Sequence, residues 1–133
     1  MAKKRILIVE DDVECALGYQ ELLEDDYEVA VAHDGSTGLR MVEEAAAPFD
    51  LLILDMMMPS GEDLQTPDMG LSTGLETMRE LEQRGVSIPT IVISVVWDEG
   101  MTAQIRARGA RAVLQKPVRP STKLLEAVAQ VLA

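Results

Sequence analysis

Acidic side chains stand directly after two short apolar runs of the sequence. Glu10, Asp11 and Asp12 follow the run RILIV, and Asp55 follows the run DLLIL. If both runs are strands of one parallel sheet, their carboxyl ends lie at the same edge, and the acids meet there. Carboxylates this close repel one another strongly when partly desolvated, so they need a cation. Oxygen ligands without histidine or cysteine favour a hard ion, and the sequence therefore predicts a Mg²⁺ site.

A hydroxyl group and an ammonium group follow two further apolar runs. Ser94 ends the run TIVIS, and Lys116 comes directly after AVLQ, followed by a proline. The bond between Lys116 and Pro117 can be cis at small energetic cost. A carboxylate nucleophile, a metal site, a hydroxyl donor and a fixed cation are the groups needed for phosphoryl transfer onto an aspartate. The four run ends together indicate this chemistry, with Asp55 as the acceptor.

The apolar runs and the segments between them predict an α/β fold. Three of the runs are apolar at consecutive positions, which is typical of strands covered on both faces of a parallel sheet. Helical stripes lie between the runs, such as Cys15, Tyr19, Leu22 and Leu23, and the weakest stripe lies at residues 99–107. We expect a doubly wound, five-stranded parallel sheet with helices on both faces and its ligand site at the carboxyl ends of the strands.

Length and composition favour a single cytoplasmic domain. The chain has 133 residues, enough for one core, and its one cysteine, Cys15, allows no intramolecular disulfide. No pattern of zinc-binding spacing is present, and a reducing, cytoplasmic location fits best. The apolar run near the N-terminus is too short for a signal peptide or a membrane span. We therefore expect no membrane contact.

The charge is strongly negative but unevenly placed. The net charge of −11 argues against direct nucleic-acid binding, which needs clustered lysine and arginine. Residues 1–103 carry a net charge of −16, whereas residues 104–133 carry +5. This basic segment could receive an acidic partner or be a solvated face, and the sequence does not decide between the two.

The sequence resembles the receiver domain of bacterial two-component response regulators. The resemblance rests on ILIVEDD, LILDMMMP, Ser94 and GARAVLQKP, and it covers essentially the whole chain. It implies a flavodoxin-like (βα)5 fold, with residues 1–133 forming one receiver domain without an effector domain. Such a domain is a phosphoacceptor in signal transduction and not an enzyme, although it assists its own phosphorylation and dephosphorylation.

The resemblance also implies a role for each site residue. Asp55 would accept the phosphoryl group from the phosphohistidine of a sensor histidine kinase or phosphotransfer protein. Lys116 would pair with that group, and the Ser94 hydroxyl would then bond it and bias the signalling surface between two states. Mg²⁺ would be held by four groups: Asp11 directly, Glu10 through a water molecule, Asp55, and the backbone carbonyl of Met57.

Partners and competing functions remain open at this point. The resemblance places the unknown output partner at residues 94–123, and a homodimer is also possible. One alternative is a receiver-like interaction module that works without phosphorylation. Another is a Mg²⁺-dependent phosphatase, which is disfavoured because Met57 stands where such enzymes usually carry a second acid.

One segment departs from the usual pattern of the family. Pro59 and Gly74 are 15 positions apart, about 11 more than is typical, so we expect an extended loop after the third strand. The chemistry does not need this length. The inserted residues 60–73 are therefore a candidate lid or partner-specificity loop.

Overall fold

Five parallel strands form a single sheet in the order β2-β1-β3-β4-β5. The computed structural model describes residues 3–56, 72–94 and 99–133, so residues 60–71 of the expected loop lie outside the described residues. The strands are β1 (Arg5–Val9), β2 (Glu28–Ala32), β3 (Leu51–Asp55), β4 (Thr90–Ser94) and β5 (Ala110–Gln115). The helices are α1 (Val13–Leu23), α2 (Gly35–Glu44), α3 (Ser72–Gln83), α4 (Glu99–Ala107) and α5 (Thr122–Val131).

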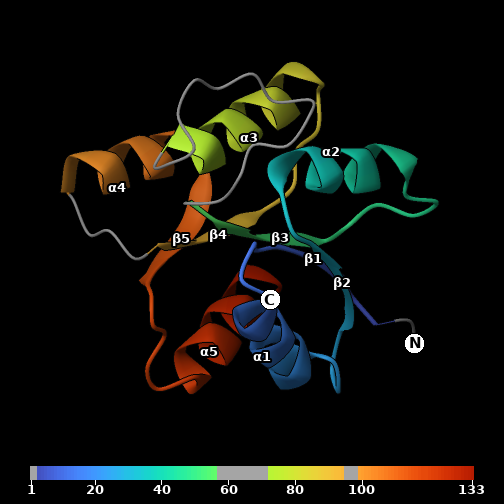
Figure 1. Ribbon diagram of the computed structural model, residues 1–133, viewed down its shortest axis with the longest axis vertical. Helices are drawn as coiled ribbons and strands as arrows, with labels where there is room; N and C mark the ends of the chain where they lie inside the picture. The colour runs from blue at the N-terminus through green and yellow to red at the C-terminus, as the bar shows by residue number, and fades with distance from the viewer. Residues whose placement is uncertain (1–2, 57–71, 95–98) are drawn as a thin grey trace.

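The elements form three layers. Helices α2, α3 and α4 cover one face of the sheet, and α1 and α5 cover the other (Figure 1). The predicted doubly wound parallel sheet is therefore confirmed, including the helix at residues 99–107, where the apolar stripe was weakest. Strand β5 begins at Ala110, two residues before the apolar run AVLQ.

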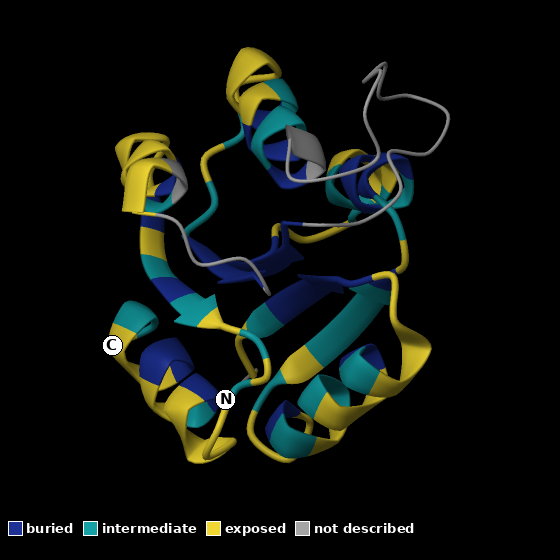
Figure 2. Ribbon diagram, turned by 60° about the vertical axis from the view of Figure 1, so that its left-hand side comes forward, coloured by how far each residue is buried: buried dark blue, intermediate teal, exposed yellow. Residues whose placement is uncertain are grey.

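Consecutive apolar residues in the strands serve two separate cores. Leu7 and Val9 of β1 pack in the cluster beneath α2, α3 and α4, whereas Ile6 and Ile8 pack in the cluster with α1 and α5. All four side chains are at most 1% exposed. Because successive side chains of a strand point to opposite faces, only an unbroken apolar run can fill both cores. Figure 2 shows the resulting buried layer between the two sets of helices.

Strands β2 and β5 lie at the two edges of the sheet, which explains why fewer of their residues are buried. β2 and β5 each pair with only one neighbouring strand, and their residues are less buried than those of β1, β3 and β4.

Within the described residues, no helix is long and apolar enough to cross a membrane.

The core on the α1 and α5 side gives a direct test of this packing. Ile91 of β4 is 0% exposed, so Ile91→Ala is expected to lower the free energy of unfolding by about 2–5 kcal/mol. Leu17 of α1 is 51% exposed, and Leu17→Ala should change it by no more than about 0.5 kcal/mol. Urea denaturation of both variants measures the difference, and equal losses would contradict the assigned core.

Candidate functional site

The register of the sheet brings the ends of four strands to one level. Val9 pairs with Leu54, so Glu10 and Asp55 are the next residues of two neighbouring strands. Backbone hydrogen bonds continue the ladder beyond the strands, from Glu10 N to Ala32 O at 2.9 Å and from Lys116 N to Ser94 O at 2.8 Å. The predicted site residues are therefore set side by side by backbone pairing that does not depend on their own side chains.

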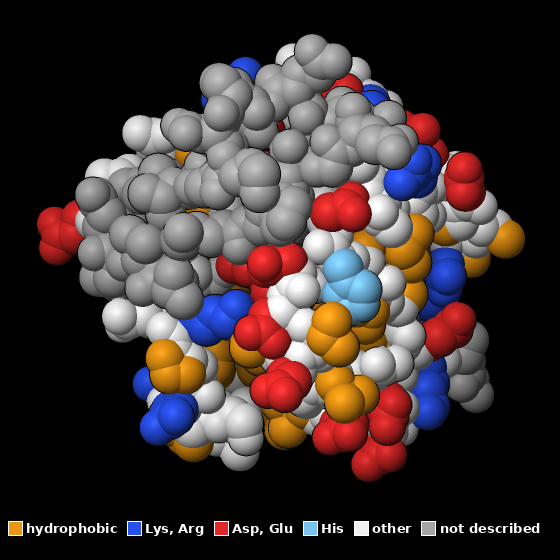
Figure 3. Space-filling model, viewed as in Figure 1, with side chains coloured by type: hydrophobic (Ala, Val, Ile, Leu, Met, Phe, Trp, Pro, Cys, Tyr) orange, Lys and Arg blue, Asp and Glu red, His pale blue; other side chains and the backbone are white. Residues whose placement is uncertain are grey.

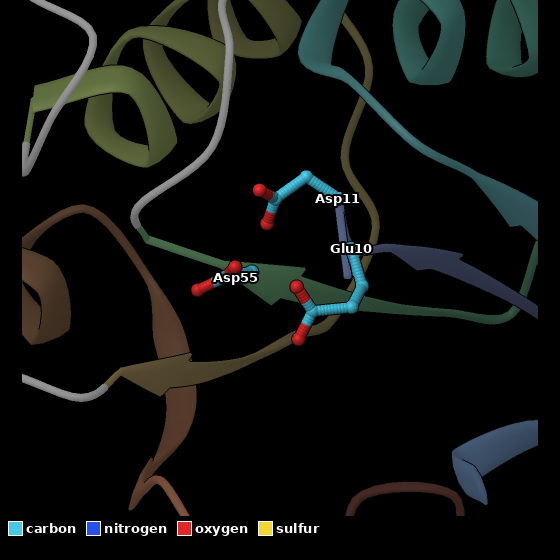
Figure 4. A group of neighbouring side chains, drawn as sticks. All are labelled: Glu10, Asp11 and Asp55. Atoms are coloured by element: carbon cyan, nitrogen blue, oxygen red, sulfur yellow. The ribbon is translucent and has the colours of Figure 1, made fainter. Parts of the chain in front are cut away.

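Three of the four acids that the sequence singled out converge at this edge. Carboxylate oxygens of Glu10, Asp11 and Asp55 all lie within 4.8 Å of one another. Figure 4 shows the three carboxyl groups turned toward a common space at the ends of β1 and β3. Glu10 is 1% exposed and Asp55 is 4% exposed, so little water separates these two charges, whereas Asp11 is exposed. Figure 3, which has the view of Figure 1, shows acidic side chains gathered near the middle of that face.

The fourth acid, Asp12, is used differently. Its carboxylate accepts hydrogen bonds from the backbone N–H groups of Glu14 and Cys15 and caps the N-terminus of α1. These bonds, that of Cys15 foremost, lower the pKa of Asp12 below its ordinary value. Asp12 follows the same apolar run as Glu10 and Asp11, but it serves the start of α1 and is not among the three acids that converge. The cap fixes where α1 leaves the site.

Lys116 supplies the positive charge among the carboxylates. Its Nζ donates to Glu10 Oε1 at 2.6 Å and lies 3.7 Å from Asp55 Oδ2. Its side chain is 15% exposed, so both ion pairs are shielded from most of the solvent. The structure therefore places Lys116 beside Asp55, as the sequence predicted, but with its shorter contact to Glu10. The peptide bond from Lys116 to Pro117 is cis.

Ser94 completes the described part of the site. It is 3% exposed at the end of β4, one residue beyond Ile93, which pairs with Asp55 in the sheet. Its own register partner is Gln115, the residue before Lys116. Ser94 therefore lies between the strand of the acceptor and the strand of the lysine. Met57, predicted to offer its backbone carbonyl to the metal, lies outside the described residues.

Comparison with known proteins identifies this arrangement. The sequence pattern of the response regulator receiver domain matches residues 6–129. The chain belongs to the response regulator receiver domain family. A receiver domain protein described as CheY-like, from Methanospirillum hungatei, has the same fold with a TM-score of 0.79 at 28% sequence identity, over 98% of this chain and 94% of that one.

Curated relatives are longer proteins. The chain is 34% identical to the sensor histidine kinase TmoS of Ectopseudomonas mendocina over 115 residues, which is 85% of this chain and 10% of that protein. It is also 34% identical to a transcriptional regulatory protein of Picosynechococcus over 121 residues, 86% of this chain and 44% of that protein. The receiver domain thus spans less than half the length of these relatives.

The charge state of Lys116 follows from its surroundings in the receiver domain. Burial alone would lower the pKa of its ammonium group, but the hydrogen bond to Glu10 and the charges of Asp55 and Glu10 outweigh burial and raise the pKa above its ordinary value. The Lys116 ammonium group is therefore charged at neutral pH. Nearby, burial raises the pKa of Tyr19 in α1 to about 12, so its phenol adds no negative charge to the acidic edge.

The acidic group of the receiver domain fits a hard cation. Its three members offer only oxygen ligands, and one lysine cannot neutralise three carboxylates. Glu10, Asp11 and Asp55 are thus able to hold a metal ion, as the sequence predicted. The set leaves no nitrogen or sulfur ligand to favour zinc.

His33 makes a contact with the acidic edge that sequence reasoning missed. It is an exposed residue after β2, as expected for a solvated loop, but its Nδ1 lies 2.9 Å from the backbone carbonyl of Glu10. The contact joins the β2–α2 connection to the acidic edge. The available signal was the position of His33 directly after a strand that ends at the same edge.

Removing the lysine tests the balance of charges. Lys116→Gln is expected to lower the free energy of unfolding by about 2–4 kcal/mol, because the buried Glu10 loses its partner. Added MgCl₂ should restore part of this loss, because a divalent ion can reduce the repulsion among the carboxylates that the lysine no longer offsets. Urea denaturation with and without MgCl₂ provides the measurement.

Lys123→Gln is the matched control, because Lys123 is an exposed lysine of α5. Its stability should differ from that of wild type under the same condition by no more than about 0.5 kcal/mol, both with and without Mg²⁺. Equal losses for the two lysine variants, or no response of Lys116→Gln to Mg²⁺, would contradict the charge balance described above.

Proposed function

We propose that this receiver domain accepts a phosphoryl group on Asp55 from a phosphohistidine of a sensor histidine kinase or phosphotransfer protein. The observation that carries the proposal is the setting of Asp55, a nearly buried carboxylate 3.7 Å from the Lys116 ammonium and beside two further acids. Burying an acid among like charges costs free energy, and such groups cluster at functional sites. Its place at the carboxyl end of a parallel strand supports a ligand-binding role.

The proposed transfer exchanges one bond to phosphorus for another. An Asp55 carboxylate oxygen forms the new bond to phosphorus as the bond to the imidazole nitrogen of the donor breaks, and the imidazole leaves with those electrons. Lys116 is close enough to pair with a negatively charged oxygen of the group on Asp55. The buried Ser94 hydroxyl, on the neighbouring strand, would hydrogen-bond the transferred group.

Mg²⁺ is the cofactor that we propose for this reaction. Glu10, Asp11 and Asp55 would hold it, together with the backbone carbonyl of Met57. When bound, the ion neutralises negative charge where acceptor and phosphoryl group meet. The chain itself contributes the orientation of Asp55, the fixed charge of Lys116 and the exclusion of water by burial of Glu10 and Asp55.

The biological setting is a part of the same proposal. The domain acts in the cytoplasm as a signalling component, assisting its own phosphorylation and dephosphorylation without turning over another substrate. Phosphorylation biases its surface between two states, and the end of β4 at Ser94 connects the site to that surface.

Intact-protein mass after incubation with acetyl phosphate and MgCl₂ tests the acceptor. We expect one species heavier by about 80 Da, absent in Asp55→Asn and absent when EDTA removes Mg²⁺. If neither wild type nor Asp55→Asn gains this mass under any condition, including with a phosphorylated kinase, the domain is an interaction module that works without phosphorylation.

A basic groove between α4, β5 and α5 is the output surface that we propose. It encloses about 310 Å³, and three cations (Arg106, Arg111 and Lys123) and one acid (Glu126) line it around the apolar residues Ala112 and Leu114. Within the described part of the chain, none of the three cations forms an ion pair. Cations and an apolar floor together suit an acidic amphipathic partner.

An acidic amphipathic peptide of glutamate, alanine and leucine, labelled with fluorescein, serves as a probe for this groove. Reversing two charges in Arg111→Glu/Lys123→Glu should weaken its binding about tenfold or more in fluorescence anisotropy, and added NaCl should weaken wild-type binding. Arg79→Glu on α3 is the control, since Arg79 is an exposed cation outside the groove. Equal weakening per reversed charge by Arg79→Glu would mean that the probe senses only overall charge.

A further inference from the structure

Gly74 lies against the residue that follows Asp55. A Cβ atom built on Gly74 would stand 2.5 Å from Met56 Sδ, 2.9 Å from Met56 Cε and 2.8 Å from Met56 Cα. Two of these contacts involve a flexible side chain, but the third involves the backbone, which cannot move aside without moving the end of β3. Gly74 therefore has no room for any side chain while Met56 stays in place.

The need for glycine at this position comes from contact and not from backbone conformation. Among the described glycines, only Gly85 and Gly109 have a positive φ. Gly18, in the middle of α1, has nothing within 4 Å of an added Cβ. Gly74 thus differs from these other glycines in being packed directly on the strand that carries the acceptor.

Met56 is held from both sides. Its N–H donates to Ile93 O of β4 at 3.2 Å, which extends the sheet by one residue beyond Asp55. Its carbonyl accepts from Gly74 N at 3.1 Å, and this N–H belongs to the first turn of α3, where helical N–H groups have no partner within the helix. The Met56 side chain is 0% exposed in the core beneath α3. The chain leaving Asp55 is therefore fixed at its first residue.

We propose that Gly74 is a positioning residue for Asp55, because its missing side chain lets α3 close onto Met56 and so holds the end of β3 in place. The proposal rests on the proposed function of Asp55 as the acceptor. A larger residue at Gly74 pushes Met56 away, and the displacement passes through one peptide unit to Asp55. The distance between Asp55 and Lys116 then changes, although neither residue is substituted.

The test is the rate of phosphorylation by saturating acetyl phosphate with MgCl₂, followed by intact mass. Gly74→Ala should slow it tenfold or more at a temperature where thermal melting shows a folded protein, since misplacing reacting groups by about 1 Å can cost about 100-fold. A rate within about threefold of wild type would overturn the proposal. If wild type itself never gains a phosphoryl group, the proposed function fails instead, so the two failures are distinguishable.

Two controls separate positioning from loss of stability. Leu81 lies on the same helix, seven residues beyond Gly74, and in the same core, where it is 7% exposed, so Leu81→Ala should lower stability. If its melting temperature is as low as that of Gly74→Ala, its rate of phosphorylation should still lie within about threefold of the wild-type rate. Gly18→Ala adds the same methyl group where space is open and should behave as wild type. If Leu81→Ala is slowed as much as Gly74→Ala, Gly74 only stabilises the fold and the proposal is wrong.

A double variant tests the contact itself. Met56→Ala/Gly74→Ala removes the clashes with Sδ and Cε but keeps the one with Met56 Cα, so the rate should rise above that of Gly74→Ala and stay below wild type. No recovery would contradict a route through Met56. If Gly74→Ala alone does not fold, the double variant carries the test, where a slowed folded protein supports the proposal and a wild-type rate overturns it.

Discussion

The repulsion among three carboxylates at the ends of β1 and β3 is the constraint on which the rest of this structure depends. Glu10 and Asp55 are nearly buried, and their oxygens lie within 4.8 Å of each other and of Asp11. Lys116 offsets part of that repulsion through its 2.6 Å contact with Glu10, and its raised pKa keeps it charged. The remaining negative charge makes the edge receptive to a cation and to a phosphoryl group carried with it.

Backbone pairing holds these groups together, and the two buried cores supply the free energy that keeps the pairing in register. The register of Val9 with Leu54, and of Asp55 with Ile93, is fixed by side chains buried in two cores on opposite faces of the sheet. A slip of one residue would exchange the faces of every apolar side chain in the strand. The fold can therefore support an unfavourable cluster of charges, because the energy that sets its geometry comes from the cores.

Much of this site could be predicted from the sequence, because its residues stand at the ends of apolar runs, where periodicity and position agree. Glu10, Asp11, Asp55, Ser94 and Lys116 lie at the predicted edge. Contacts that depend on tertiary placement could not be predicted in the same way. The bond between His33 and the Glu10 carbonyl, the preference of Lys116 for Glu10 and the packing of Gly74 on Met56 each join segments whose distance no local pattern encodes.

The most direct test of the central claim is a titration of the protein with MgCl₂ and then beryllofluoride, followed by the fluorescence of Trp97. This is the one tryptophan in the chain, three residues after Ser94. If the acids at the strand ends hold Mg²⁺ and Asp55 takes up the phosphoryl group, both additions change the fluorescence, and Asp55→Asn abolishes the response to beryllofluoride. A wild-type protein that responds to neither addition, or an Asp55→Asn variant that responds as wild type does, would contradict the account.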